Sequence, residues 1–136
     1  MCIRDRQLAE TVDMYPTVAE LAGLPVPKGP QSIDGKSLVP VLKNPKARVR
    51  DHAFHAYPRR RLGRAIRTER YRLVEWRNPG EPVNKAEYEL YDYSKGSVET
   101  VNLAKKKPAL VKELATILAK YPEPVSRGGR KPKKNK

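Results

Sequence analysis

Residues 108–120 carry the feature that most constrains the fold, an apolar stripe that repeats with the period of an α-helix. Pro108 suits the first turn of a helix because an N–H at that position would have no intrahelical partner. The stripe consists of Leu110, Val111, Leu114, Ile117 and Leu118. A helix with one apolar face needs another element to cover that face, and a sheet is the expected partner.

The segments expected to form strands all lie upstream of this helix. They are His52–Tyr57, Arg64–Thr68, Tyr71–Trp76 and Glu87–Tyr93. Alternation is clearest in the third segment, where Tyr71, Leu73 and Glu75 point to one face of the strand. The link 68–70 is short enough for an antiparallel hairpin. The sequence therefore predicts an α+β fold, with a small antiparallel β-sheet of about four strands packed on the C-terminal helix.

One or two short helices are expected before the sheet. The first is predicted over Met14–Ala22, with Asp13 as its N-cap and Gly23 as a left-handed residue after its end. Its inward face is predicted to consist of Val18, Leu21 and Ala22. A second short helix is predicted to begin at Ser37, with Pro40 in its first turn. Its inward residues are expected to be Leu38, Val41 and Leu42.

Basic residues dominate the charge of this chain. The 136 residues carry a formal net charge of +14, which favours polyanionic partners or anionic surfaces. The excess is concentrated in an arginine-rich stretch, 59–77, and in 126–136, which has no apolar side chain to offset the entropy of ordering. We therefore expect 123–136 to be a disordered basic tail that binds polyanions without specificity.

The sequence offers little for a metal site, a disulfide or a membrane span. Cys2 is the one cysteine, which excludes an internal disulfide and a cysteine-built zinc site. The acidic residues occur singly, and His52 and His55 are predicted to point to opposite faces of a strand, one packed and one exposed. No apolar run approaches the roughly 20 residues of a membrane-spanning helix. We predict no metal ligands and no membrane span.

Several blocks of the chain, in this order, resemble the C-terminal part of the sulfatase family, within the alkaline-phosphatase-like superfamily. They are Val12–Thr17, Glu20–Pro25, Asp34–Leu38, Ala65–Trp76, Tyr88–Asp92 and Glu99–Ala104. The string His55–Arg59 specifically resembles the iduronate-2-sulfatase branch. The resemblance implies that the parent protein is a sulfuric ester hydrolase acting on sulfated polysaccharide and exported to the periplasm or the cell exterior.

The resemblance also implies a division of the chain. Residues 1–6 are expected to be a non-native scar, and 7–47 the end of the large sulfatase domain with its connecting short helices. Residues 48–122 are expected to be the C-terminal subdomain of an α/β sulfatase. The partner is then the N-terminal sulfatase domain of the parent protein, which this chain lacks.

The catalytic chemistry implied by the resemblance is absent from this sequence. Sulfatases use calcium and a formylglycine made from the cysteine of a Cys-x-Pro-x-Arg motif, and such groups stabilise charge on the sulfate oxygens. Cys2 precedes Arg4 where that motif has proline, so the match is attributed to chance. We predict no catalytic residue and no cofactor in this chain, although calcium and formylglycine are implied for the parent enzyme.

Arg59, Arg60, Arg61 and Arg64 are the candidate substrate-binding residues. They are predicted to lie in a loop between two strands, and arginine pairs bidentately with sulfate or carboxylate groups. The alternative is a merely solvated loop, with Arg67 or Arg72 bonded to carboxylates of the absent domain. Trp76 is expected to pack against the helix rather than on a sugar.

A second class of function stays open from the charge alone, that of a small basic protein that binds nucleic acid or another polyanion. The sequence shows no recognition helix, no aromatic RNA-stacking motif and no zinc module. Such binding would be mainly electrostatic and steeply dependent on salt.

Overall fold

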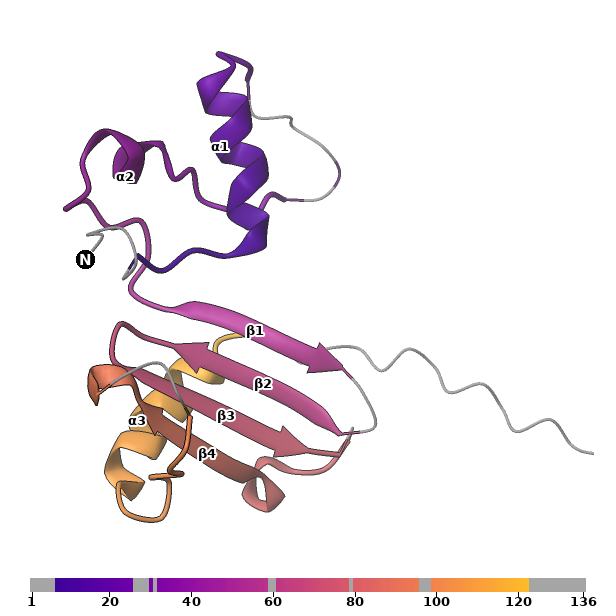
Figure 1. Ribbon diagram of the computed structural model, residues 1–136. Helices are drawn as coiled ribbons and strands as arrows, with labels where there is room; N and C mark the ends of the chain where they lie inside the picture. The colour runs from indigo at the N-terminus through magenta and orange to yellow at the C-terminus, as the bar shows by residue number, and fades with distance from the viewer. Residues whose placement is uncertain are drawn as a thin grey trace, which may run out of the picture.

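A computed structural model of the chain describes residues 7–25, 30, 32–58, 61–78, 80–95 and 99–122. The predicted scar and the predicted basic tail lie outside these residues. The described part forms two layers below a small helical unit (Figure 1). No helix in the described part of the chain has the length and apolar character needed to cross a bilayer.

The lower part of the molecule is a four-stranded antiparallel sheet in the order β1-β2-β3-β4. Its strands are β1 (Ala53–Pro58), β2 (Leu62–Arg67), β3 (Tyr71–Arg77) and β4 (Glu87–Asp92). Arg67 pairs with Arg72 across the β2–β3 hairpin, and the Thr68 N–H donates to the Tyr71 carbonyl oxygen at 2.8 Å. The predicted hairpin is confirmed, and the structure is the predicted α+β fold.

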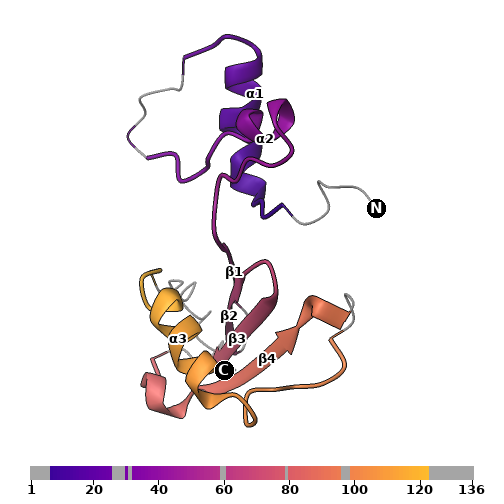
Figure 2. The same ribbon diagram turned by 90° about the vertical axis from the view of Figure 1, so that its left-hand side faces the viewer.

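Helix α3 (Pro108–Leu118) covers one face of the sheet, as Figure 2 shows from the side. Leu73, Leu90 and Leu114 form the buried centre of this layer, and Leu118 is fully buried. Each such side chain contributes roughly 1.5–3 kcal/mol relative to an exposed one. Leu110, Val111 and Ile117 of the predicted stripe pack around this centre. The helix and its inward face were therefore predictable from periodicity alone.

The free edge of β4 is covered by the segment that leads to α3. The Asn102 side-chain oxygen accepts from the Leu90 N–H at 3.0 Å, and its amide donates to the Tyr88 carbonyl at 3.2 Å. The Leu103 N–H donates to the Leu90 carbonyl oxygen at 2.8 Å. These bonds satisfy backbone groups that an open sheet edge would leave unpaired.

The upper unit contains the short 3₁₀-helix η2 (Thr11–Asp13) and the α-helices α1 (Met14–Leu21) and α2 (Val39–Lys43). Gly23 has φ +67°, and the Leu24 N–H reaches the Ala19 carbonyl oxygen at 2.9 Å, which closes α1 as predicted. Pro40 lies in the first turn of α2, also as predicted. Two further short 3₁₀-helices, η3 (Val83–Lys85) and η4 (Tyr93–Lys95), flank β4.

The predicted inward faces of these short helices are partly wrong. Val18 and Leu21 are 57% and 64% exposed, whereas Pro16, Thr17 and Ala19 are the buried residues of α1. Val41 is buried as predicted, but Leu42 is 47% exposed. The apolar face of α1 thus points away from the rest of the described chain.

Asp13 does not cap α1 through its side chain, contrary to the prediction. Its fully buried carboxylate instead accepts hydrogen bonds from the Lys36 and Glu10 N–H groups, each at 2.8 Å, and from Arg50. The other side of the Arg50 guanidinium donates to Glu10 at 2.7 Å, and Glu10 also accepts from the Phe54 N–H. This Asp13 cluster (Glu10, Asp13, Arg50) ties the helical unit to β1.

The pKa of Asp13 reflects two opposed effects. Burial raises this pKa, but the hydrogen bonds from the Lys36 and Glu10 amides and from Arg50 outweigh burial, so the net pKa is lowered. Asp13 is therefore ionised in the folded chain and neutralises the buried Arg50 guanidinium.

Candidate functional site

The structure describes two of the four arginines predicted to contact substrate. Arg59 and Arg60 lie outside the described residues. Arg61 is in the β1–β2 connection, next to Leu62, the first residue of β2. Arg64 lies within β2 rather than in the connection, because this strand begins two residues earlier than predicted. Only Arg61 is therefore described at the turn itself.

Arg61 is held at the end of the sheet by a surface ion pair. Its guanidinium lies 3.0 Å from the Glu87 carboxylate of β4, with side-chain exposures of 44% and 70%. An exposed pair of this kind contributes about 0–1 kcal/mol, so it exchanges readily for another anion. Arg61 is thus positioned to bind an anionic group from solution.

Arg64 belongs to a buried network on the α3 side of the sheet, which we call the Glu75 cluster (Arg64, Glu75, Arg77, Tyr88). Arg64 donates to the Glu75 carboxylate at 2.7 and 3.1 Å and to the Tyr121 carbonyl oxygen at 3.3 Å. Arg77 donates to the same carboxylate at 3.2 Å, and the Tyr88 hydroxyl donates at 3.1 Å. The Arg64 guanidinium is therefore committed to partners inside the chain.

Burial and the neighbouring Glu75 charge raise the pKa of Tyr88 to about 12. Tyr88 consequently stays protonated and serves as a donor to Glu75 at all physiological pH values. The sequence could have indicated this cluster through Glu75. This residue lies on the same inward face of β3 as Leu73, where an unpaired carboxylate would be costly, so a basic partner is expected.

Arg67 and Arg72 have partners within the described chain. Arg72 donates to both Glu99 carboxylate oxygens, at 2.7 and 2.9 Å, and Tyr93 also donates to Glu99. The Arg67 guanidinium lies over the Tyr93 ring at 3.6 Å. Arg72 thus already has a carboxylate partner, Glu99, within the described part of the chain.

Trp76 lies on the face of β3 opposite to Leu73 and to α3. The prediction that Trp76 packs against this helix is therefore wrong. It pairs across the strands with Gly63 of β2 and Glu87 of β4. A Cβ atom at position 63 would lie 2.6–3.1 Å from three neighbouring carbons of the Trp76 benzene ring. The ring therefore lies flat over Gly63.

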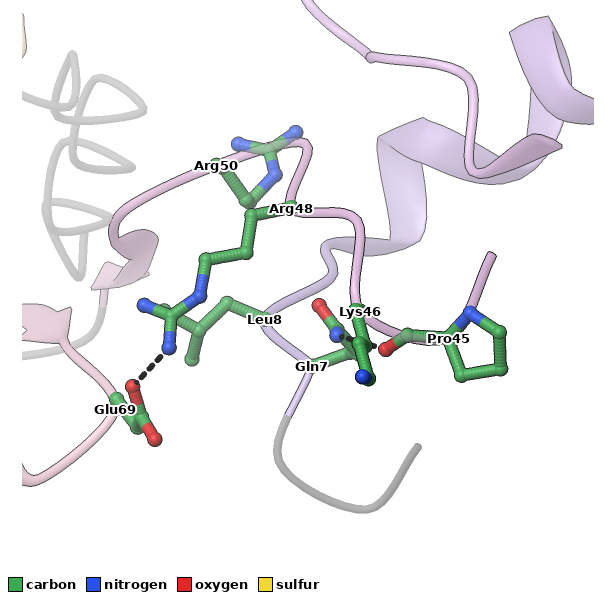
Figure 3. Close-up of a pocket in the computed structure, with 7 residues that line it drawn as sticks. All are labelled: Gln7, Leu8, Pro45, Lys46, Arg48, Arg50 and Glu69. Atoms are coloured by element: carbon green, nitrogen blue, oxygen red, sulfur yellow. Dashed lines mark hydrogen bonds and ion pairs between the residues drawn. The ribbon is translucent and has the colours of Figure 1, made fainter. Parts of the chain in front are cut away.

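A polar recess of about 300 Å³ lies at the opposite end of the sheet, beside the β2–β3 hairpin (Figure 3). Arg48 there pairs with Glu69 at 2.6 Å, and the Gln7 amide donates to the Pro45 carbonyl oxygen at 3.0 Å. Arg50 also lines the recess, but its guanidinium is engaged in the Asp13 cluster. The recess holds no pair of acid and base groups poised for catalysis.

The histidines and acidic residues do not gather into a metal centre within the described ranges, where no group of three or more His, Cys, Asp or Glu side chains converges. The His52 ring contacts the Tyr121 hydroxyl at 2.8 Å, and His55 is exposed. Cys2 lies outside these ranges. The described residues therefore do not fit a calcium ion.

Comparison with known proteins gives one family. The model of the family "N-sulphoglucosamine sulphohydrolase, C-terminal" matches residues 3–124. A sulfatase from Formosa agariphila is 32% identical over 79% of this chain and 21% of its own length.

Solved structures give the same fold. A protein solved in complex with its substrate D-glucosamine-2-N,6-O-disulfate is 28% identical, with a TM-score of 0.64 over 79% of this chain and 22% of that one. A sulfatase-like protein from Bacteroides thetaiotaomicron is also 28% identical, with a TM-score of 0.65 over 80% and 23%. The chain thus spans less than a quarter of each relative, and it belongs to the family of sulfatase C-terminal domains.

Proposed function

We propose that this chain is the non-catalytic part of a sulfatase that hydrolyses sulfate esters of a sulfated polysaccharide. The observation that carries the proposal is the family match over residues 3–124, in a chain whose described residues hold no metal-ligand cluster. Catalysis would come from an N-terminal domain that carries calcium and formylglycine. The match to a sulfatase domain does not favour the nucleic-acid alternative.

We also propose that residues 7–47 are the end of the large sulfatase domain with its connecting short helices, while 48–122 form the C-terminal subdomain. The exposed apolar side chains of the helical unit support this division. Met14, Tyr15, Val18 and Leu21 are 54–64% exposed and recur with helical spacing along α1. A contiguous apolar face on a soluble domain is typical of a surface that another element covers.

The substrate contact is proposed for the arginine-rich connection, Arg59–Arg61, together with the nearby Arg64. Arg61 carries the argument among the described residues because its carboxylate partner, Glu87, is itself 70% exposed and can be replaced by an anionic ligand. Arg64 would act indirectly, by holding the end of β2 through Glu75. A sulfate or a uronate carboxylate suits the planar guanidinium fork.

Two sulfated units are candidates for the substrate. The string His55–Arg59 supports an iduronate 2-sulfate, through the resemblance to iduronate-2-sulfatases. The structural relative bound to D-glucosamine-2-N,6-O-disulfate supports a sulfated glucosamine. Both units carry anionic groups on a pyranose ring, and both occur in the class of sulfated polysaccharides.

The test is to titrate the chain with each sulfated sugar while measuring binding by calorimetry and sulfate release by ion chromatography. We expect saturable binding of at least one sugar with no release of sulfate. Release of sulfate by the chain alone would contradict the non-catalytic assignment.

Arg61→Ser is the site variant, and Arg48→Ser is its matched control. Arg48 is an exposed arginine with a surface carboxylate partner at the other end of the sheet, so both changes remove one charge. Arg61→Ser should weaken binding by roughly tenfold, as for the loss of a charge-assisted bond, and Arg48→Ser by less than about twofold. Equal losses would indicate nonspecific attraction to a basic chain.

A further inference from the structure

The indole of Trp76 is partly buried, and one of its faces lies on Gly63. An added Cβ at position 63 would lie 2.6, 3.0 and 3.1 Å from Cζ3, Cη2 and Cε3 of the ring, respectively, so the ring lies flat on this glycine. Helix α3 packs against Leu73 on the opposite side of the sheet. An aromatic ring that lies flat on a glycine is a rigid apolar surface, and it loses little conformational entropy when a ligand stacks on it.

Cationic and apolar groups meet at this position. Glu87 pairs directly with Trp76 across β3 and β4, and such partners have Cβ atoms about 4.5–5.5 Å apart. The Arg61 guanidinium, 3.0 Å from the Glu87 carboxylate, is therefore held within one side-chain length of the indole. Tyr57, 42% exposed, lies in the same cross-strand row beyond Gly63.

We propose that Trp76 is a stacking platform for one pyranose ring of a sulfated sugar, whose sulfate takes the place of Glu87 at Arg61. This inference rests on the proposed substrate class and adds a binding residue to it. A sulfated sugar matches both groups, since its C–H face is apolar and its substituent is anionic.

The charges favour a sugar over a protein surface as the occupant. A protein domain seated on Trp76 would remove water from Arg61 and Glu87, which are 44% and 70% exposed, and desolvating an ion pair is costly. A single sugar ring covers the indole and leaves these side chains in contact with water. Trp76 thus suits a small amphipathic ligand better than a domain interface.

Trp76 is the one tryptophan of the chain, so its fluorescence reports on this position alone. The probe is D-glucosamine-2-N,6-O-disulfate, with unsulfated glucosamine and sodium sulfate at matched ionic strength as controls. We expect a saturable change in the emission of the complete chain with the disulfated sugar and none with sodium sulfate. An emission spectrum that the disulfated sugar leaves unchanged would refute the platform.

Variants measured by calorimetry separate stacking from charge. Trp76→Ala should weaken binding by roughly tenfold, the usual effect of losing one stacked ring, whereas Trp76→Phe should retain most of the affinity. Gly63→Ala displaces the indole and should weaken binding while Trp76 remains. Circular dichroism checks that each variant is folded, and the wild-type fluorescence titration decides the question if Trp76→Ala does not fold.

The two proposals fail in different ways. If Arg61→Ser weakens binding but Trp76→Ala and Gly63→Ala do not, and the wild-type emission is unchanged, the platform is wrong and the proposed function stands. If no sulfated sugar binds the chain, both proposals fail.

Discussion

Replacing Glu75 by glutamine tests the account of the sheet interior. Glu75 is 2% exposed, and its carboxylate accepts hydrogen bonds from Arg64, Arg77 and Tyr88 at 2.7–3.2 Å. Glutamine keeps the size of the side chain but removes the negative charge, so two buried guanidinium groups lose their shared counter-ion. Breaking one partner of a buried ion pair costs about 3–5 kcal/mol, a large part of the 5–15 kcal/mol that stabilises a typical domain.

The assay is urea unfolding followed by far-ultraviolet circular dichroism, with Glu69→Gln as the matched control. Glu69 also pairs with an arginine, Arg48, but both side chains are about half exposed, at 46% and 62%. The control should therefore change the free energy of unfolding by less than about 1 kcal/mol. A loss below about 1 kcal/mol for Glu75→Gln would refute the argument that this carboxylate neutralises the buried arginines.

The remaining predictions concern the helical unit. The folded-state pKa of Asp13 lies below its unfolded value of 3.8, so the stability that the ionised carboxylate contributes is complete above pH 3.8 and is lost as the pH falls through the lowered pKa. Asp13→Asn should therefore flatten the decline of the free energy of unfolding below pH 3.8. A decline as steep as that of the wild type would contradict this. A Cβ at Gly35 would collide with the Val12 backbone carbonyl. Gly35→Ala should therefore lower the Tm in thermal unfolding by several degrees, as expected for a stability loss above about 1 kcal/mol. The control Lys36→Ala, at an exposed neighbouring residue, should leave the Tm unchanged. Leu21→Asp should leave chain stability within about 0.5 kcal/mol but lower the binding of an apolar dye, and undiminished dye fluorescence would argue against an exposed apolar face on α1.

The sheet and α3 were predictable because their signals are local and periodic. The Thr68–Arg70 link joins two alternating segments, and the resulting hairpin sets the β2–β3 register. Pro108 and the stripe around Leu114 predict both the start of α3 and its inward face. Such features depend only on neighbours within a few residues, so a single sequence is enough to recognise them.

The polar clusters were missed because their partners are distant in the chain. Asp13 has the spacing of a helix cap, yet its carboxylate binds Arg50, which is 37 residues away. The face occupied by Trp76 was also misjudged, although strict alternation with Leu73 places it opposite α3. For α1, the periodic apolar face does exist, but nothing in the pattern tells whether this chain or another covers it.

The central claim is that this domain binds a sulfated sugar without hydrolysing it, and saturation-transfer NMR tests both parts in one experiment. The complete chain is mixed with D-glucosamine-2-N,6-O-disulfate, and the sugar spectrum is recorded over time. The account predicts saturation transfer to the ring protons, strongest for those that would lie on Trp76, and no desulfated product. New product signals, or an absence of transfer, would contradict it.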